Sequence, residues 1–191
     1  VLGLPQESLD DLQRAALLHD IGKIGVPQVI LDKPDKLTDT EYEIIKKHPS
    51  IGARILGPIQ AYKKIIPMIE EHHERYDGKG YPFGKCGEEI HLYARIMALA
   101  DAFDAMVSDR PYREGLGRDR AIKIIREEAG SQFDPKIVEA FNQVVDRPIG
   151  IIPFESFEMS SQPIIFLDNL FGSDAAGVQK IGSMHSEGKP Q

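Results

Sequence analysis

The stretch "ALLHDIGKIGVP", residues 15–26, ends an apolar run on an adjacent histidine and aspartate, His19 and Asp20. The apolar residues before this pair fall on one side of a helix, which the pattern predicts over residues 9–18, with Ser8 as its N-cap. A glycine-rich turn follows at once and contains Lys23. Two metal-binding side chains at a helix end predict a site only if the rest of the chain supplies partners for them.

Further candidate ligands lie at or near other predicted helix ends. His48 precedes Pro49, and proline disfavours helical geometry in the residue before it, so one helix ends there and another begins. His72 and His73 follow an apolar helical stretch. Asp101 lies in a helix of small and apolar residues, where burying an unpaired carboxylate would be costly. Each residue alone is explained as well by a hydrogen-bonded histidine or a surface charge, but together they predict a shared site.

Such a site has a definite chemistry. Several helix ends that present histidine or aspartate to a common core form the metal sites of helical bundles. Imidazole and carboxylate ligands without a thiolate favour iron or manganese over structural zinc. Asp20 can bridge two divalent ions, and two ions can activate a shared water and stabilise both oxygens of a phosphoester. The candidate ligands are His19, Asp20, His48, His72, His73 and Asp101.

The rest of the pattern is almost entirely helical. Thr38 and Glu41 form a capping box, and Asp119 and Asp134 are the expected N-caps of the last two helices. Two apolar segments, 151–159 and 162–171, are either strands or docked extended segments. We therefore expect an all-α helical bundle over residues 1–146 with a metal site in its core. An irregular, partly disordered C-terminal extension is expected over residues 147–191.

Composition excludes several classes of partner. The net charge of −7 gives no global basic field for DNA or RNA. A single cysteine, Cys86, rules out an internal disulfide, which is typical of a reducing cytoplasm. The sequence has no apolar run of membrane-spanning length and no secretion signal, so we expect a cytoplasmic location. Because the sequence lacks an initiator methionine, we also expect the natural chain to extend upstream.

The motifs "HDIGK" (19–23), His48, "HHERYDGKGYP" (72–82), "AD.FDA" (100–105) and "RPYR" (110–113) resemble the HD-GYP family, a branch of the HD phosphohydrolases. Their order and spacing match over residues 9–141. The resemblance implies a bacterial, all-helical phosphodiesterase with two or three metal ions. Its implied substrate is cyclic di-GMP, a second messenger, which it would hydrolyse to the linear dinucleotide pGpG and often to GMP.

Matched position by position, the six candidate ligands are the family's metal ligands, with Asp20 as the bridging carboxylate. Lys23 matches a lysine near the scissile phosphate, its alternative being a solvated surface lysine. Gly80, Tyr81 and Pro82 match the family's signature loop. Tyr81 either stacks on a base, fixes the loop or contacts a partner, and loop structure or partner contact is favoured over catalysis. The implied partners are GGDEF-type diguanylate cyclases or adaptors. The residues that match the substrate groove are Asp104, Arg110 and Arg113, and an ion pair with Asp109 or Glu114 explains Arg113 equally well. We expect Glu70, Glu71 and Glu74 to form a solvated face, and His91 to be structural.

Two rival functions stay open at this stage. The chain is either an HD phosphohydrolase for another nucleotide, or a non-catalytic signalling module that binds its partner through the Gly-Tyr-Pro loop. Family members with a third metal have an extra glutamate and histidine upstream of "HD", and no histidine precedes Leu9. We therefore expect two ions from these residues, and a third if the chain upstream supplies the extra ligands. A receiver or sensor domain upstream is a further implication of the resemblance.

Overall fold

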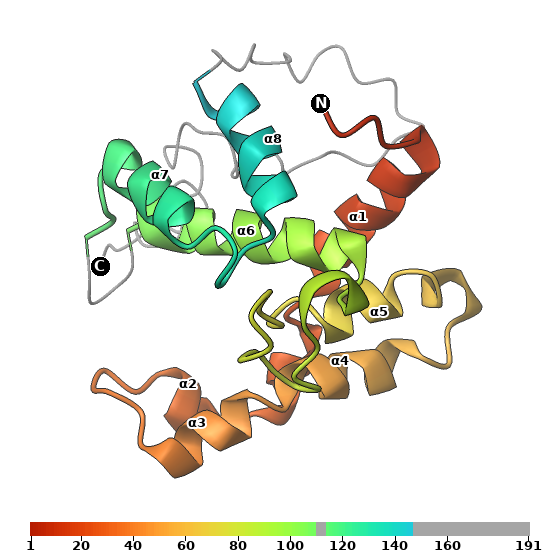
Figure 1. Cartoon of the computed structure of the whole chain (residues 1–191). Coiled ribbons are helices and arrows are strands. Elements are labelled where there is room, and N and C mark those ends of the chain that lie inside the picture. Colours follow the sequence, from red (N-terminus) through yellow and green to blue (C-terminus); the bar gives the residue numbers. More distant parts are fainter. Residues whose placement is uncertain (110–113, 147–191) are drawn as a thin grey trace, which may run out of the picture.

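The computed structural model describes residues 1–109 and 114–146. Within these ranges the chain forms helices and no β-strand, which confirms the all-α prediction (Figure 1). The α-helices are α1 (Gln6–Leu18), α2 (Gln28–Leu31), α3 (Asp39–Ile45), α4 (His48–Leu56), α5 (Ile66–Glu70), α6 (Leu92–Val107), α7 (Arg118–Glu127) and α8 (Pro135–Val145). Three short 3₁₀ helices are η1 (Ile21–Gly25), η2 (Gln60–Tyr62) and η3 (Gly87–Glu89).

Local sequence explains several of these helix ends. Thr38 and Glu41 form the predicted capping box of α3, and the Asp134 side chain accepts a hydrogen bond from the Lys136 amide at the start of α8. Two predicted caps are wrong. Ser8 is not the N-cap of α1, because the helix already begins at Gln6. Asp119 is not the N-cap of α7, because the helix begins at Arg118 and Asp119 lies in its first turn. A carboxylate there still interacts favourably with the helix dipole.

Two hydrophobic clusters form the core, and α6 contributes to both. One cluster joins α6 to α7 and α8, and the other joins α6 to α1, α4 and α5. Buried residues of the first cluster are Leu99, Phe103, Ala121, Ile122, Ile125, Phe133, Ile137, Val138, Phe141 and Val145. Those of the second are Ala15, Leu56, Ile65, Met68, Ile69 and Met97. Since α6 belongs to both, it fixes the position of α1, α4 and α5 relative to α7 and α8.

We expect Ile125→Ala to lower the free energy of unfolding by about 2–5 kcal/mol, because its fully buried side chain would leave a cavity in the first cluster. Val29→Ala also removes apolar atoms, but from a side chain that is 77% exposed, and should change stability by less than about 0.5 kcal/mol. Urea unfolding at fixed metal content measures both. Equal effects of the two substitutions would contradict this description of the core.

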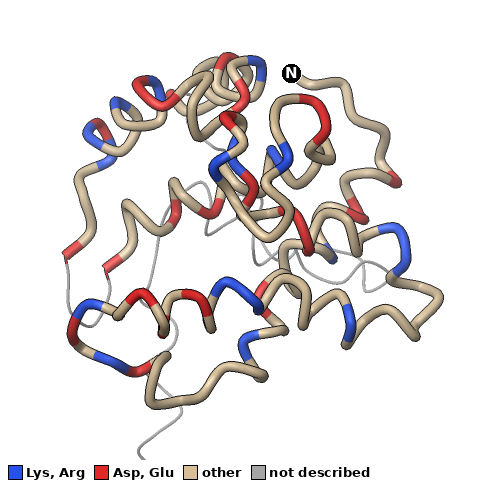
Figure 2. The backbone as a smooth tube through the Cα atoms, turned by 60° about the horizontal axis from the view of Figure 1, so that its bottom comes forward, with Lys and Arg blue, Asp and Glu red and all other residues tan. Residues whose placement is uncertain are grey.

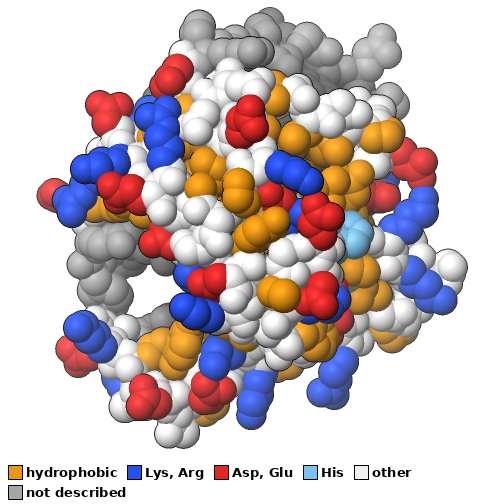
Figure 3. Space-filling view, in the orientation of Figure 1, with side chains coloured by type: hydrophobic (Ala, Val, Ile, Leu, Met, Phe, Trp, Pro, Cys, Tyr) orange, Lys and Arg blue, Asp and Glu red, His pale blue; other side chains and the backbone are white. Residues whose placement is uncertain are grey.

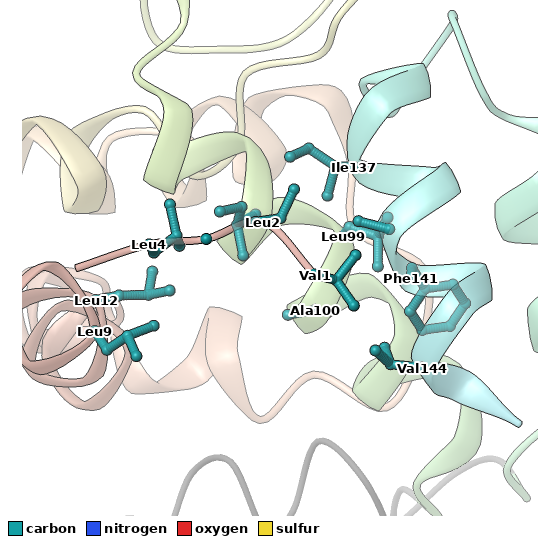
Figure 4. A pocket seen from close by; sticks show the side chains of 13 residues that line it. Val1, Leu2, Leu4, Leu9, Leu12, Leu99, Ala100, Ile137, Phe141 and Val144 are labelled. Atoms are coloured by element: carbon teal, nitrogen blue, oxygen red, sulfur yellow. The ribbon is translucent and has the colours of Figure 1, made fainter. Parts of the chain in front are cut away.

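An apolar cavity of about 430 Å³ lies where the N-terminal segment meets α1, α6 and α8 (Figure 4). Val1, Leu2 and Leu4 line it together with Leu99 of α6 and Phe141 of α8. Only glycine and apolar side chains line the cavity. It therefore offers no side chain for acid–base chemistry or metal binding.

Lys and Arg are interspersed with Asp and Glu along the described chain, so neither sign forms a continuous stripe (Figure 2). Within the described ranges, every helix is too short or too polar to span a bilayer. Residues 147–191, with the two apolar segments, lie outside the described residues. The domain boundary at residue 146 and the disordered extension stay predictions.

Candidate metal centre

Four segments of the chain meet at the candidate ligands. His19 and Asp20 follow α1, His48 begins α4, His72 and His73 follow α5, and Asp101 lies within α6. His48 Nε2 lies 3.3 Å from Asp20 Oδ1, while His19 Nε2 lies 3.5 Å from Asp20 Oδ2 and 3.9 Å from Asp101 Oδ1. The His72 ring lies 3.9 Å from that of His73 and 5.0 Å from that of His19, centroid to centroid. The fold thus brings all six candidates into one neighbourhood.

Three of the histidines each make the same kind of backbone contact, which fixes the tautomer of the ring. The Nδ1 atoms of His19, His48 and His72 lie 2.7, 2.7 and 2.6 Å from the carbonyl oxygens of the residues three positions earlier. Because a carbonyl only accepts, each Nδ1 must donate, and in the neutral ring Nε2 is then the acceptor nitrogen. Metal-binding histidines are oriented by this kind of hydrogen bond in known sites.

Buried polar atoms at the centre test whether the residues fit a metal. Nε2 of His48, Nε2 of His72 and Oδ1 of Asp20 are buried without a hydrogen-bond partner. Such atoms are costly to bury unless something compensates them. The ligand atoms of His48, His72 and His73 lie within 4.8 Å of one another, and so do those of His19, Asp20 and His72. The two overlapping groups, made of imidazoles and a carboxylate, fit divalent metal ions.

The protonation states suit the same role. Burial lowers the pKa of His72, and the nearby His73 adds to this effect. Burial lowers the pKa of His73 to about 3, and the electrostatic interaction with His48 adds to this effect. Burial alone would raise the pKa of Asp20, but His48, His19 and Lys23 together lower it well below its usual value. At neutral pH these residues are therefore neutral imidazoles and a carboxylate, the forms that bind metals.

A close backbone contact holds Asp20 next to His48. A Cβ atom on Gly22 would lie 1.9 Å from the His48 carbonyl oxygen and 2.5 Å from the Gly52 amide nitrogen. Only a glycine therefore lets η1 approach the start of α4 this closely. The contact joins the segment that contains Asp20 directly to the one that contains His48.

The predicted substrate residues are only partly within the described structure. Lys23 reaches the centre, where its Nζ lies 2.5 Å from Asp20 Oδ2. Asp104 lies one helical turn after Asp101 on α6 and accepts a hydrogen bond from the Ser108 hydroxyl at 3.2 Å. Arg110 and Arg113 lie outside the described residues, so their place in a groove stays a prediction.

The Gly-Tyr-Pro loop packs on the segment that contains the paired histidines. A Cβ on Gly80 would lie 2.5 Å from the Glu74 Cα, so glycine is needed for this approach. The Tyr81 amide donates to the His73 carbonyl at 3.2 Å, and the Tyr81 ring lies 4.8 Å from the His73 ring. The loop therefore touches a candidate ligand directly.

Two glutamates of this segment are placed differently from the prediction. Glu71 and Glu74 are buried, not part of a solvated face. Glu74 Oε1 accepts from the Phe83 and Gly84 amides at 2.6 and 3.1 Å. Glu71 accepts from Lys85 Nζ and from the His91 amide, both at 2.7 Å. Their partners are 9–20 residues away, so no local pattern indicated that they hold the loop.

His91 has the structural role expected of it. It is the N-cap of α6, and its Nδ1 accepts from the Tyr93 amide at 3.3 Å.

Comparison with known proteins places the chain in a family. The HD domain family model matches residues 1–137. The cyclic di-GMP phosphodiesterase response regulator RpfG of Xanthomonas campestris pv. campestris is 46% identical over 141 residues, covering 73% of this chain and 37% of that protein. The 3′3′-cGAMP-specific phosphodiesterase 3 of Vibrio cholerae is 42% identical over 135 residues, covering 71% and 29%. The chain thus spans about 30–40% of the length of these relatives.

A solved structure shows the same fold. The cyclic GMP-AMP specific phosphodiesterase V-cGAP3 of V. cholerae aligns with a TM-score of 0.58 at 23% identity, over 77% of this chain and 40% of the other. Because the family model matches residues 1–137 and these relatives are more than 40% identical, the chain belongs to the HD domain family and to its HD-GYP branch.

Proposed function

We propose that this domain is a metal-dependent phosphodiesterase that hydrolyses cyclic di-GMP to pGpG. The observation that supports it is the cluster of buried imidazole and carboxylate atoms that face one another without hydrogen-bond partners. Relatives named as cyclic di-GMP phosphodiesterases, at 46% and 44% identity, support the substrate.

The six candidate ligands would hold two divalent ions, with Asp20 between the two histidine groups. Divalent ions in such a site make water nucleophilic at neutral pH and offset the charge of a phosphodiester. The hydrogen bonds at Nδ1 orient the buried rings of His48 and His72, so that Nε2 is the nitrogen that would bind a metal ion. Lys23 offers an ammonium next to Asp20, placed to stabilise charge that develops on a phosphoryl oxygen.

Lys23→Met should lower kcat for cyclic di-GMP by about 100- to 1000-fold while leaving metal content unchanged, because it removes one donor to the transition state but no ligand. Lys64→Met, which removes an exposed lysine paired with Glu7, is the control and should retain activity. Steady-state kinetics and metal analysis check both variants. A Lys23→Met enzyme with wild-type kcat would contradict this role.

Three substrates compared side by side test the function itself. Cyclic di-GMP, 3′3′-cGAMP and bis(p-nitrophenyl) phosphate are supplied to one preparation, and chromatography separates pGpG from GMP. We expect cyclic di-GMP to give the highest kcat/KM. A preference for 3′3′-cGAMP would instead favour the activity named for other relatives, and binding without turnover of any of them would favour a non-catalytic module.

Iron or manganese is the proposed metal, because the ligand set lacks a thiolate. Mass spectrometry of protein purified with and without air measures identity and number. About two ions of iron or manganese per chain are expected, and structural zinc as the sole metal would contradict the proposal.

The cellular setting is also proposed from the resemblance. A GGDEF-type cyclase or an adaptor would contact the Gly-Tyr-Pro loop, and a receiver or sensor domain upstream would regulate turnover in the bacterial cytoplasm. The close packing of Gly80 against Glu74, and the burial of Glu74, support a rigid loop, which suits a surface for recognition.

A further inference from the structure

A row of aromatic rings leads from the metal centre to α3. The His73 ring lies 5.0 Å from that of His48 and 4.8 Å from that of Tyr81, whose plane is tilted by only 30°. Tyr81 in turn meets Tyr42 of α3 edge to face, with centroids 6.3 Å apart. The row begins at two candidate ligands and ends on a different segment of the chain.

The last ring of the row is open to solvent but held in place. Tyr42 is 47% exposed, whereas Tyr81 is only partly exposed. Lys46 Nζ lies 5.4 Å from the Tyr42 centroid and 5.8 Å from that of Tyr81, within cation–π range of both. Lys46 also forms an ion pair with Glu43. Tyr42 is therefore an exposed aromatic surface whose position is fixed from two sides.

The helix that presents Tyr42 is itself anchored. The Thr38–Glu41 capping box closes its first turn, and Lys33 Nζ donates to both carboxylate oxygens of Glu41 at 2.6 and 2.9 Å. In the space-filling view the surface is hollowed between the α2–α3 part and the rest of the molecule (Figure 3). A ligand that extends from the metal centre toward α3 would meet a preformed wall, with little ordering to lose on binding.

We propose that the exposed face of Tyr42, held by Tyr81 and Lys46, stacks on a purine base of the substrate. The inference rests on the proposed function, in which a phosphate of a cyclic dinucleotide lies at the ligands that begin this row. Bases stack on aromatic side chains through their π-faces, and nearly half of the Tyr42 surface, 47%, is exposed to a ligand. Lys46 supplies a donor beside it for the N7 and O6 acceptors of guanine.

The experiment measures binding separately from turnover. Fluorescently labelled cyclic di-GMP gives Kd for the wild type, Tyr42→Leu and Tyr42→Trp, and kinetics with cyclic di-GMP and with bis(p-nitrophenyl) phosphate, which has no purine, give KM and kcat. Thr40→Ala, at an exposed position of the same helix, is the control. Tyr42→Leu should raise Kd and KM for cyclic di-GMP about 10-fold with little change in kcat. Tyr42→Trp should restore binding, and turnover of the purine-free diester should be unchanged in every variant.

Two results would overturn the assignment. One is an unchanged Kd in Tyr42→Leu. The other is an equal loss of kcat for both substrates, which would mean that Tyr42 only supports the loop. A wild-type protein that binds cyclic di-GMP but does not hydrolyse it would refute the proposed function alone, since the Kd series still tests Tyr42.

Discussion

Asp20→Asn should abolish both turnover and metal binding. The substitution keeps the size of the side chain but removes the charge that lies between the histidine groups, 3.3 Å from His48 Nε2 and 3.5 Å from His19 Nε2. Loss of residues that only orient metal ligands costs about 10- to 100-fold in metal affinity or activity, so loss of a proposed bridging ligand should cost more than about 100-fold.

Metal content by mass spectrometry and kcat for cyclic di-GMP measure the result together. Asp10→Asn changes a partly exposed carboxylate of α1, which accepts a hydrogen bond from Gln6, and should leave both values at the wild-type level. Full metal occupancy with normal turnover in Asp20→Asn would refute the metal centre. Full occupancy with lost turnover would show instead that Asp20 is needed for chemistry and not for binding.

The sequence predicted the convergence of the ligands because their residue types are unusual for their positions. Histidine and aspartate at the ends of apolar helices, and Asp101 in a helix of small residues, are costly to bury unless they share a partner. Helix periodicity, Pro49 and the Thr38–Glu41 box then located α3, α4 and α6 to within a few residues.

Features that depend on tertiary contact were not predictable in this way. Glu71 and Glu74 follow apolar residues in a charged stretch, and only the folded loop shows that backbone amides and Lys85 surround them. In His19, His48 and His72, Nδ1 contacts the carbonyl oxygen of the residue three positions earlier. This contact depends on the local backbone geometry at each histidine, which a sequence pattern does not specify. Likewise, no sequence pattern indicated a role for Tyr42, and only the structure places it at the end of the row of aromatic rings.

Gly22 is another residue whose role depends on a tertiary contact and not on local sequence. Its backbone conformation is not one that requires glycine, and its importance lies in the contact with α4. Gly22→Ala should destabilise the protein by more than about 3 kcal/mol, because the new methyl group would overlap backbone atoms of His48 and Gly52, which cannot move aside as a flexible side chain can.

Separation of η1 from α4 should also move Asp20 away from His48, so metal affinity should fall in Gly22→Ala protein that remains folded. Urea unfolding of the metal-free protein measures the loss of stability, and titration with Mn²⁺ measures the loss of affinity. Gly117→Ala is the matched control, because a Cβ there meets no atom within 4 Å, and its stability should change by less than about 1 kcal/mol. If Gly22→Ala behaves like Gly117→Ala in both measurements, then the contact between η1 and α4 does not hold the two ligands together.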